Sequence, residues 1–137
     1  MARDIIHNSV KNALVKDGWE ITDDPYHIEY KDLRLSADLG AERPFAAQKD
    51  NEKIAIEIKS FIGHSAIQDF KLALGQYMLY LTYLELVDPE RKLYLAVSEK
   101  VFDELFTRES IQFARKRNQM SLIVVNLANE EIKQWIA

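Results

Sequence analysis

The sequence predicts a mixed α/β fold, in which one sheet carries helices on its faces. Three observations support this class. The stretch IAIEIKSF at residues 54–61 alternates isoleucines with other residues, as a strand does. Two nearly continuous apolar runs, LYLAV at 93–97 and LIVV at 122–125, are typical of strands buried on both faces. Helical patterns lie before all the strands, between residues 61 and 93, and between the two apolar runs.

Length and composition point to one globular domain. With 137 residues the chain is long enough for one real core, so we expect residues 1–137 to form a single domain. The absence of cysteine excludes disulfides and thiolate metal sites, and it fits a cytoplasmic location. The N-terminus lacks the apolar core of a signal peptide. The most apolar segment, 72–86, is interrupted by Gln76 and Glu85 and is too short to span a bilayer, so we expect no membrane association.

The formal net charge is −4 at pH 7. This is not the basic footprint of a protein that binds nucleic acid by charge alone. Any hypothesis of DNA binding therefore needs a site that works against the overall charge.

The first half of the chain predicts a helix followed by antiparallel strands. Residues 3–17 carry an amphipathic stripe, and Gly18 stands where a helix-ending glycine is expected. Polar turn residues then separate short alternating segments. We expect an extended piece at 19–22 and an antiparallel meander of strands at 26–31, 33–39, 45–48 and 54–61.

The second half predicts alternating helices and buried strands. Ser65-x-x-Gln68 is a capping-box pattern, so a helix should begin at Ser65, and it should end near Leu86 before Asp88-Pro89. The remaining elements are a strand at 93–97, helices at 99–106 and 109–117, a strand at 122–125, and a strand or helix at 131–136.

The main functional candidates are Glu57 and Lys59. On a strand they share one face, about 6 to 7 Å apart at a rise of roughly 3.3 Å per residue. The isoleucine face should point to the core, so this pair should lie on the face away from it. The pair is either a solvated ion pair or a metal ligand beside a charge aimed at a phosphate. Acid-x-Lys spacing recurs several times in the chain, and by spacing alone each pair is a surface pair.

Three features raise Glu57 and Lys59 above the other pairs. They lie in the most strand-like apolar context. An earlier predicted strand delivers Asp38 near its end, so a second carboxylate can converge on the first. The next helix carries Gln76 and Tyr80 at i and i+4, on one face.

Each of these residues also has a structural interpretation. Asp38 can cap a bend at Gly40, and Glu42 is better explained as a salt-bridge partner of Arg43. Gln76 and Tyr80 can form a helix face with one buried, hydrogen-bonded amide. The basic cluster Arg115-Lys116-Arg117 is usually a solvated helix end favoured by the helix dipole, and a contact with the DNA backbone is the alternative.

The set Asp38, Glu57-Ile58-Lys59 and Gln76-x-x-x-Tyr80 resembles the PD-(D/E)XK nuclease superfamily. Its last part resembles the QxxxY motif of the RecB-like members. The superfamily's restriction-endonuclease-like core matches the expected element order over roughly residues 3–98. Several phrases more closely resemble one small family, the XisH-type proteins or fdxN element excision controlling factors, nearly end to end: DGWEITDDP, SADLGAE, IAIEIKSF, ALGQYMLY, KLYLAV and the final WI.

The resemblance implies a function and partners. The family name implies control of a programmed DNA excision, alongside a recombinase and a companion XisI-type protein. The superfamily implies a metal-dependent endonuclease that cleaves or nicks DNA. The alternative is a catalytically silent regulator or binding module that acts with the companion. A purely structural α/β protein of the same architecture is the third reading. The predicted long helix also has more apolar surface than one face needs, which leaves room for a homo-oligomer or heteromer.

The resemblance also assigns roles to residues. Mg²⁺, or Mn²⁺, prefers carboxylates and keeps several waters, so Asp38 and Glu57 would be its ligands. The backbone carbonyl of Ile58 would be a third ligand. Lys59 would hold or help deprotonate the attacking water and would stabilise the transition state. Gln76 and Tyr80 would line the site, on the phosphate or bracing the carboxylates.

His7 departs from the superfamily pattern. Many members place a glutamate on the first helix that points to the metal, and the matching position here is His7. Because Mg²⁺ prefers oxygen, His7 either favours a softer ion such as Mn²⁺, acts outside the ligand set, or marks loss of activity. A surface histidine on the helix is the remaining interpretation.

Overall fold

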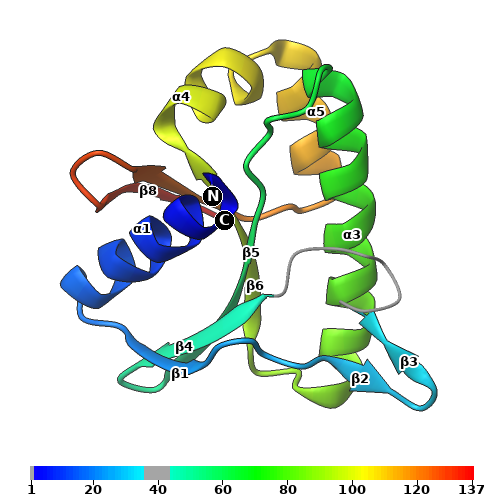
Figure 1. Ribbon diagram of the computed structural model, residues 1–137. Helices are drawn as coiled ribbons and strands as arrows, with labels where there is room; N and C mark the ends of the chain where they lie inside the picture. Colours follow the sequence, from blue (N-terminus) through cyan, green and yellow to red (C-terminus); the bar gives the residue numbers. More distant parts are fainter. Residues whose placement is uncertain (1, 36–43) are drawn as a thin grey trace.

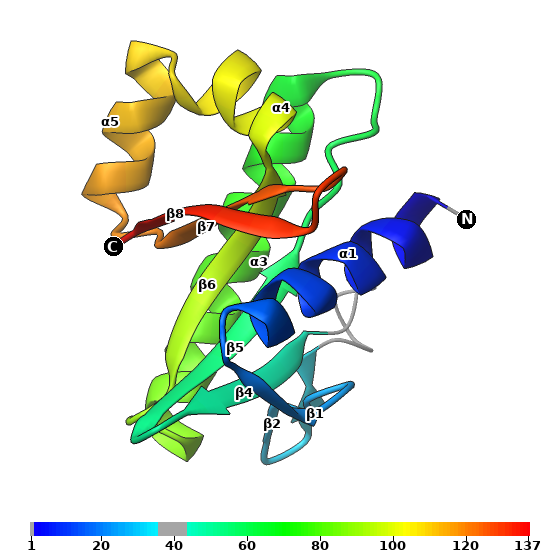
Figure 2. The same ribbon diagram turned by 90° about the vertical axis from the view of Figure 1, so that its left-hand side faces the viewer.

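The computed structural model describes residues 2–35 and 44–137 (Figures 1 and 2). A six-stranded mixed sheet forms its centre, with the strand order β1-β4-β5-β6-β7-β8. The strands β5, β6 and β7 are parallel to one another, and the outer pairs are antiparallel. The predicted fold class is confirmed. The strands are β1 (Glu20–Asp23), β4 (Phe45–Lys49), β5 (Glu52–Ile58), β6 (Lys92–Ser98), β7 (Leu122–Asn126) and β8 (Glu131–Ile136).

Helices cover both faces of this sheet, with α1 and α3 on opposite sides (Figure 2). The predicted helices are confirmed to within one or two residues, except that the segment predicted as a helix at 99–106 ends in a π-helical turn. Within the described chain, no helix is long and apolar enough to cross a membrane. The helices are α1 (Ala2–Lys16), α3 (Ala66–Val87), α4 (Glu99–Val101), the π-helical turn η1 (Phe102–Phe106) and α5 (Glu109–Arg117).

The predicted four-strand meander is wrong in its first half. The strands β2 (Glu29–Tyr30) and β3 (Leu33–Arg34) form a separate two-stranded hairpin, and β4 pairs with β1 and β5 instead. The reason is the destination of the apolar side chains. Ile28 and Leu35 are buried in the core that includes α3, so the hairpin packs against that helix and does not pair with the large sheet.

The strand β5 is buried on both faces. Ile54, Ile56 and Ile58 belong to the core beneath α1, whereas Ala55 belongs to the core beneath α3. Because side chains alternate along a strand, Glu57 faces α3 as well. Glu57 is 2% exposed. The expectation that its face points away from a core is therefore wrong, because α3 covers that face.

The sequence of α3 explains why it covers the sheet. Ser65 caps its first turn, since the Ser65 hydroxyl accepts a hydrogen bond from the backbone N–H of Gln68 at 3.3 Å. The helix ends at Asp88, whose backbone N–H donates to the carbonyl of Leu84 at 2.8 Å. Its buried side chains recur at the spacing of one helix face: Phe70, Ala73, Gln76, Tyr77, Tyr80 and Leu84.

Tyr77 fastens α3 to the parallel strands. Its hydroxyl donates to the carbonyl of Leu93 at 2.9 Å and accepts from the backbone N–H of Ser121 at 3.1 Å. The side chain is 1% exposed, so neither backbone group can turn to water when this hydroxyl is lost.

We expect Tyr77→Phe to lower the free energy of unfolding by about 1–3 kcal/mol, because it leaves a buried carbonyl and a buried N–H without their partner. Urea denaturation followed by circular dichroism measures this change. A variant as stable as the wild type would contradict the bridging role.

On the other face, α1 is tied to the turn after β1 through Asp24. The Asp24 carboxylate accepts hydrogen bonds from Lys11 Nζ at 2.5 Å and lies 3.1 Å from His7 Nε2. Partial burial alone would raise the pKa of Asp24, but these two contacts outweigh it and hold the pKa below its ordinary value. The ionised carboxylate therefore stabilises the fold.

We expect Asp24→Asn to cost about 0.5–1 kcal/mol of stability near pH 7. Because the pKa of Asp24 is lower in the folded state, its contribution is complete above about pH 4 and disappears as the pH falls through the folded pKa. Thermal unfolding of both proteins at pH 7 and pH 2.5 tests this: the difference in Tm should shrink at the lower pH. A constant difference would exclude a charge effect.

Candidate functional site

The candidate site lies where β5 ends. In open α/β sheets, ligands bind outside the carboxyl ends of the strands. After Ile58, the backbone N–H of Lys59 donates to the carbonyl of Ala96 at 3.3 Å, so strand pairing continues one residue beyond β5. This pairing keeps Lys59 on the same side of the chain as Glu57. The Lys59 side chain is half-buried, whereas Glu57 is enclosed.

Two polar side chains of α3 accompany Glu57 between helix and sheet. Gln76 is 9% exposed and Tyr80 is fully buried. The predicted i, i+4 pair therefore faces the sheet that carries Glu57. Carboxylates and amides are seldom enclosed unless they hydrogen-bond or bind a cation, so this cluster is unusual for a plain core.

The pKa of the Tyr80 hydroxyl depends on its burial and on the nearby Glu57 carboxylate. Burial raises the pKa of Tyr80 well above its ordinary value, and the negative charge of Glu57 raises this pKa further. The phenol thus stays protonated at any physiological pH and can only donate or accept as a neutral group. Within residues 2–35 and 44–137, this hydroxyl has no hydrogen-bond partner.

Glu57 acts on a second tyrosine of the same helix. Burial raises the pKa of Tyr77, the contacts from Ser121 oppose this rise, and the charge of Glu57 adds to it. The Glu57 carboxylate is therefore close to α3 and not turned to solvent. Tyr77 belongs to no catalytic motif, although its spacing from Ala73, Tyr80 and Leu84 marks the same buried face.

Asp38 and Glu42 lie outside the described residues, as does the bend expected at Gly40. The meeting of Asp38 with Glu57 therefore stays a prediction. Phe45, at the start of β4, pairs with Ile56 on β5, next to Glu57.

His7 lies on the other side of the sheet from Glu57. Its ring packs edge-on against Phe45, with ring centroids 5.4 Å apart, and it contacts the Asp24 carboxylate. Phe45 belongs to the core beneath α1, whereas Glu57 faces α3. Among the described residues, no three His, Cys, Asp or Glu side chains gather closely enough to hold a metal ion. The role of His7 as a ligand stays a prediction. Asp24, which His7 does contact, gave no signal in the sequence.

The three basic residues at the end of α5, Arg115, Lys116 and Arg117, differ in their exposure and contacts. Arg115 is 8% exposed and donates to the carbonyl of Met120 at 3.1 Å, so it secures the helix end. Lys116 and Arg117 are exposed. If this cluster contacts the DNA backbone, Lys116 and Arg117 are the residues available to do so.

Comparison with known proteins places this architecture in a family. The family model described as XisH protein matches residues 1–133. No curated protein matches the chain.

Two crystal structures are similar to the chain over almost its whole length. One is an XisH family protein from Nostoc punctiforme PCC 73102, with 37% sequence identity, a TM-score of 0.89, and coverage of 97% of this chain and 99% of that one. The other is an fdxN element excision controlling factor protein from Anabaena variabilis, with 38% identity, a TM-score of 0.89, and coverage of 98% and 99%. Sequence and structure agree over the same length, and the chain belongs to the XisH family.

Proposed function

We propose that this protein is a metal-dependent DNA endonuclease that acts in the control of DNA-element excision. Glu57, Lys59 and Asp38 would form its centre. The observation that carries the proposal is the burial of Glu57 at the end of β5, facing Gln76 and Tyr80 of α3. The relative from Anabaena variabilis, described as an excision controlling factor, supports the biological setting.

The donor set fits a hard divalent cation such as Mg²⁺ or Mn²⁺. Glu57 offers carboxylate oxygens, the ligands that such ions prefer, in an enclosed position. Asp38 and the backbone carbonyl of Ile58 would supply further oxygen ligands. When bound, the ion would supply charge neutralisation on the phosphate and a more acidic water.

The side chains around Glu57 would act on the substrate and on the attacking water. Lys59 is only half-buried, so its ammonium can reach a phosphate oxygen or hold the water. Tyr80 remains a neutral phenol because of its raised pKa, so it can donate a hydrogen bond to an anionic oxygen of a bound phosphate. Gln76 can donate from the same face of α3.

We expect Lys59→Ala to reduce nicking of supercoiled plasmid in Mg²⁺ or Mn²⁺ by about 100-fold or more, because it removes the cation beside the reacting phosphate. The conversion of supercoiled to open-circular DNA on a gel measures the rate. Lys53→Ala is the matched control, because Lys53 lies near the opposite end of β5. It should nick at the wild-type rate. Equal inertness of wild type and Lys59→Ala would refute the nuclease proposal.

We expect Tyr80→Phe to separate activity from stability. The Tyr80 hydroxyl has no partner within the described chain, so its loss should change the free energy of unfolding by less than about 0.5 kcal/mol, unlike the loss at Tyr77. The rate of nicking should nevertheless fall by about 10- to 100-fold if this hydroxyl donates to a reacting or ligating oxygen. A stable variant with unchanged activity would remove Tyr80 from the site.

A second function is favoured by the net charge of −4 and by the engagement of His7 with Asp24. In this function the chain is a catalytically silent regulator that binds DNA only with a companion XisI-type protein. Purified chain and companion should then co-elute, and DNA should shift on a gel only when both are present. A shift by the isolated chain, together with metal-dependent nicking, would exclude the silent role.

A further inference from the structure

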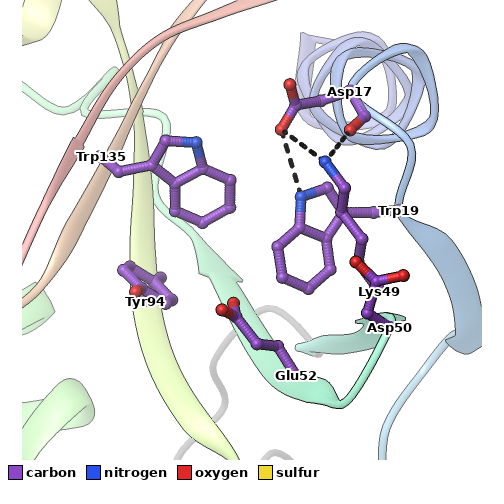
Figure 3. Close-up of a pocket in the computed structure, with 7 residues that line it drawn as sticks. All are labelled: Asp17, Trp19, Lys49, Asp50, Glu52, Tyr94 and Trp135. Carbon is purple, nitrogen blue, oxygen red and sulfur yellow. Dashed lines mark hydrogen bonds and ion pairs between the residues drawn. The ribbon is translucent and has the colours of Figure 1, made fainter.

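A cavity of about 380 Å³ lies on the α1 side of the sheet, beside Glu52 at the start of β5 (Figure 3). Glu57 lies near the other end of this strand. The cavity is surrounded by the segment that follows α1, by the β4–β5 hairpin, and by β6 and β8. None of the candidate catalytic residues lines it. Its lining residues are Asp17, Trp19, Lys49, Asp50, Glu52, Tyr94 and Trp135.

Three aromatic rings form the walls of this cavity. The ring centroids of Trp19 and Trp135 are 5.5 Å apart, and those of Tyr94 and Trp135 are 5.1 Å apart in an edge-to-face arrangement. Trp19 is fixed because its indole N–H donates to the Asp17 carboxylate at 3.2 Å. Trp135 is 37% exposed, so the cage is open on one side. Aromatic faces carry negative charge density and attract cations.

The charges in the cavity point to the same kind of ligand. Asp17, Asp50 and Glu52 contribute three negative charges and Lys49 one positive charge, which leaves a surplus of two negative charges. Figure 3 shows the Glu52 carboxylate directed toward the rings. A phosphate would be repelled here, whereas a cation would meet both carboxylates and aromatic faces.

The chain already places one of its own cations in this setting. Lys49 Nζ lies 6.0 Å from the ring centroid of Trp19 and donates to the backbone carbonyl of Asp17 at 2.6 Å. Gly18 makes room for it: its backbone has a φ of +94°, and a Cβ there would come within 3.2 Å of Lys49 Cε. The Lys49 ammonium occupies the Asp17 side, and the Glu52, Tyr94 and Trp135 side is left for a second cation.

We propose that this cavity binds an arginine side chain of a protein partner. A planar guanidinium can stack on the exposed Trp135 or on Tyr94 while it pairs with the two carboxylate oxygens of Glu52. The site would thus serve protein recognition at one end of β5, independently of the chemistry at the other end.

Tryptophan fluorescence of the full-length protein tests this directly, because the chain has two tryptophans and both line the cavity. The probe is N-acetyl-arginine amide, titrated at constant ionic strength. Its neutral and nearly isosteric control is N-acetyl-citrulline amide. We expect a saturable fluorescence change with the arginine probe, and binding at least tenfold weaker with the citrulline probe.

Two substitutions locate the binding. Glu52→Gln keeps the shape but removes one charge, and it should weaken binding of the arginine probe at least threefold. Glu104→Gln makes the same charge change on an exposed residue of η1, outside the cavity, and should leave binding unchanged. Circular dichroism confirms that both variants fold.

The proposal is overturned by any of three results. These are the absence of a saturable change, an equal response to the citrulline probe, or unaltered binding in Glu52→Gln. Because nicking is not measured in this experiment, its outcome does not depend on whether the chain is a nuclease.

Discussion

One carboxylate, that of Glu57, is enclosed between β5 and α3, and its burial limits which helix can cover this strand. β5 is the third of six strands and has apolar neighbours on both faces, yet it carries Glu57 into the core beneath α3. A helix that covers this strand must therefore offer polar groups where it crosses Glu57. The helix α3 does so with Gln76 and Tyr80, while Tyr77 satisfies backbone groups of the neighbouring strands. A purely apolar helix would make a better core and a poorer site.

The local patterns of the sequence predicted most of the fold because they record which residues share a face. The apolar runs of β6 and β7 and the cap at Ser65 each produced the expected element, and the alternation in 54–61 produced β5, which begins at Glu52 and already ends at Ile58. The same patterns could not tell whether the second face of β5 is covered, because alternation describes one strand and not its neighbours. The segment 131–136 was ambiguous for the same reason. Its pairing with β7 decides that it is a strand.

The candidate site was predicted only in part. The motif identified Glu57, Gln76 and Tyr80, and the structure brings them to one layer between sheet and helix. The motif could not predict that His7 lies on the other side of the sheet from Glu57. The position of His7 along α1 does not determine which face of the sheet this helix covers. The motif also could not find the aromatic cavity. That cavity joins residues from the segment after α1, the β4–β5 hairpin, β6 and β8, which are far apart in sequence and carry no common motif.

The net charge of −4 belongs to the whole chain and does not describe the local charge at the Glu57 end of the sheet. Glu52 and Glu57 are five residues apart on one strand, which corresponds to roughly 16 Å at about 3.3 Å per residue. The Debye length at physiological ionic strength is about 8 Å, so the carboxylates of the aromatic cavity are largely screened at the Glu57 end. What DNA would meet there is set by local groups: the half-buried Lys59 and the neutral phenol of Tyr80, with the Glu57 charge enclosed beneath them. The Glu57 end of β5 can in this way differ in local charge from the Glu52 end, although both belong to one acidic chain.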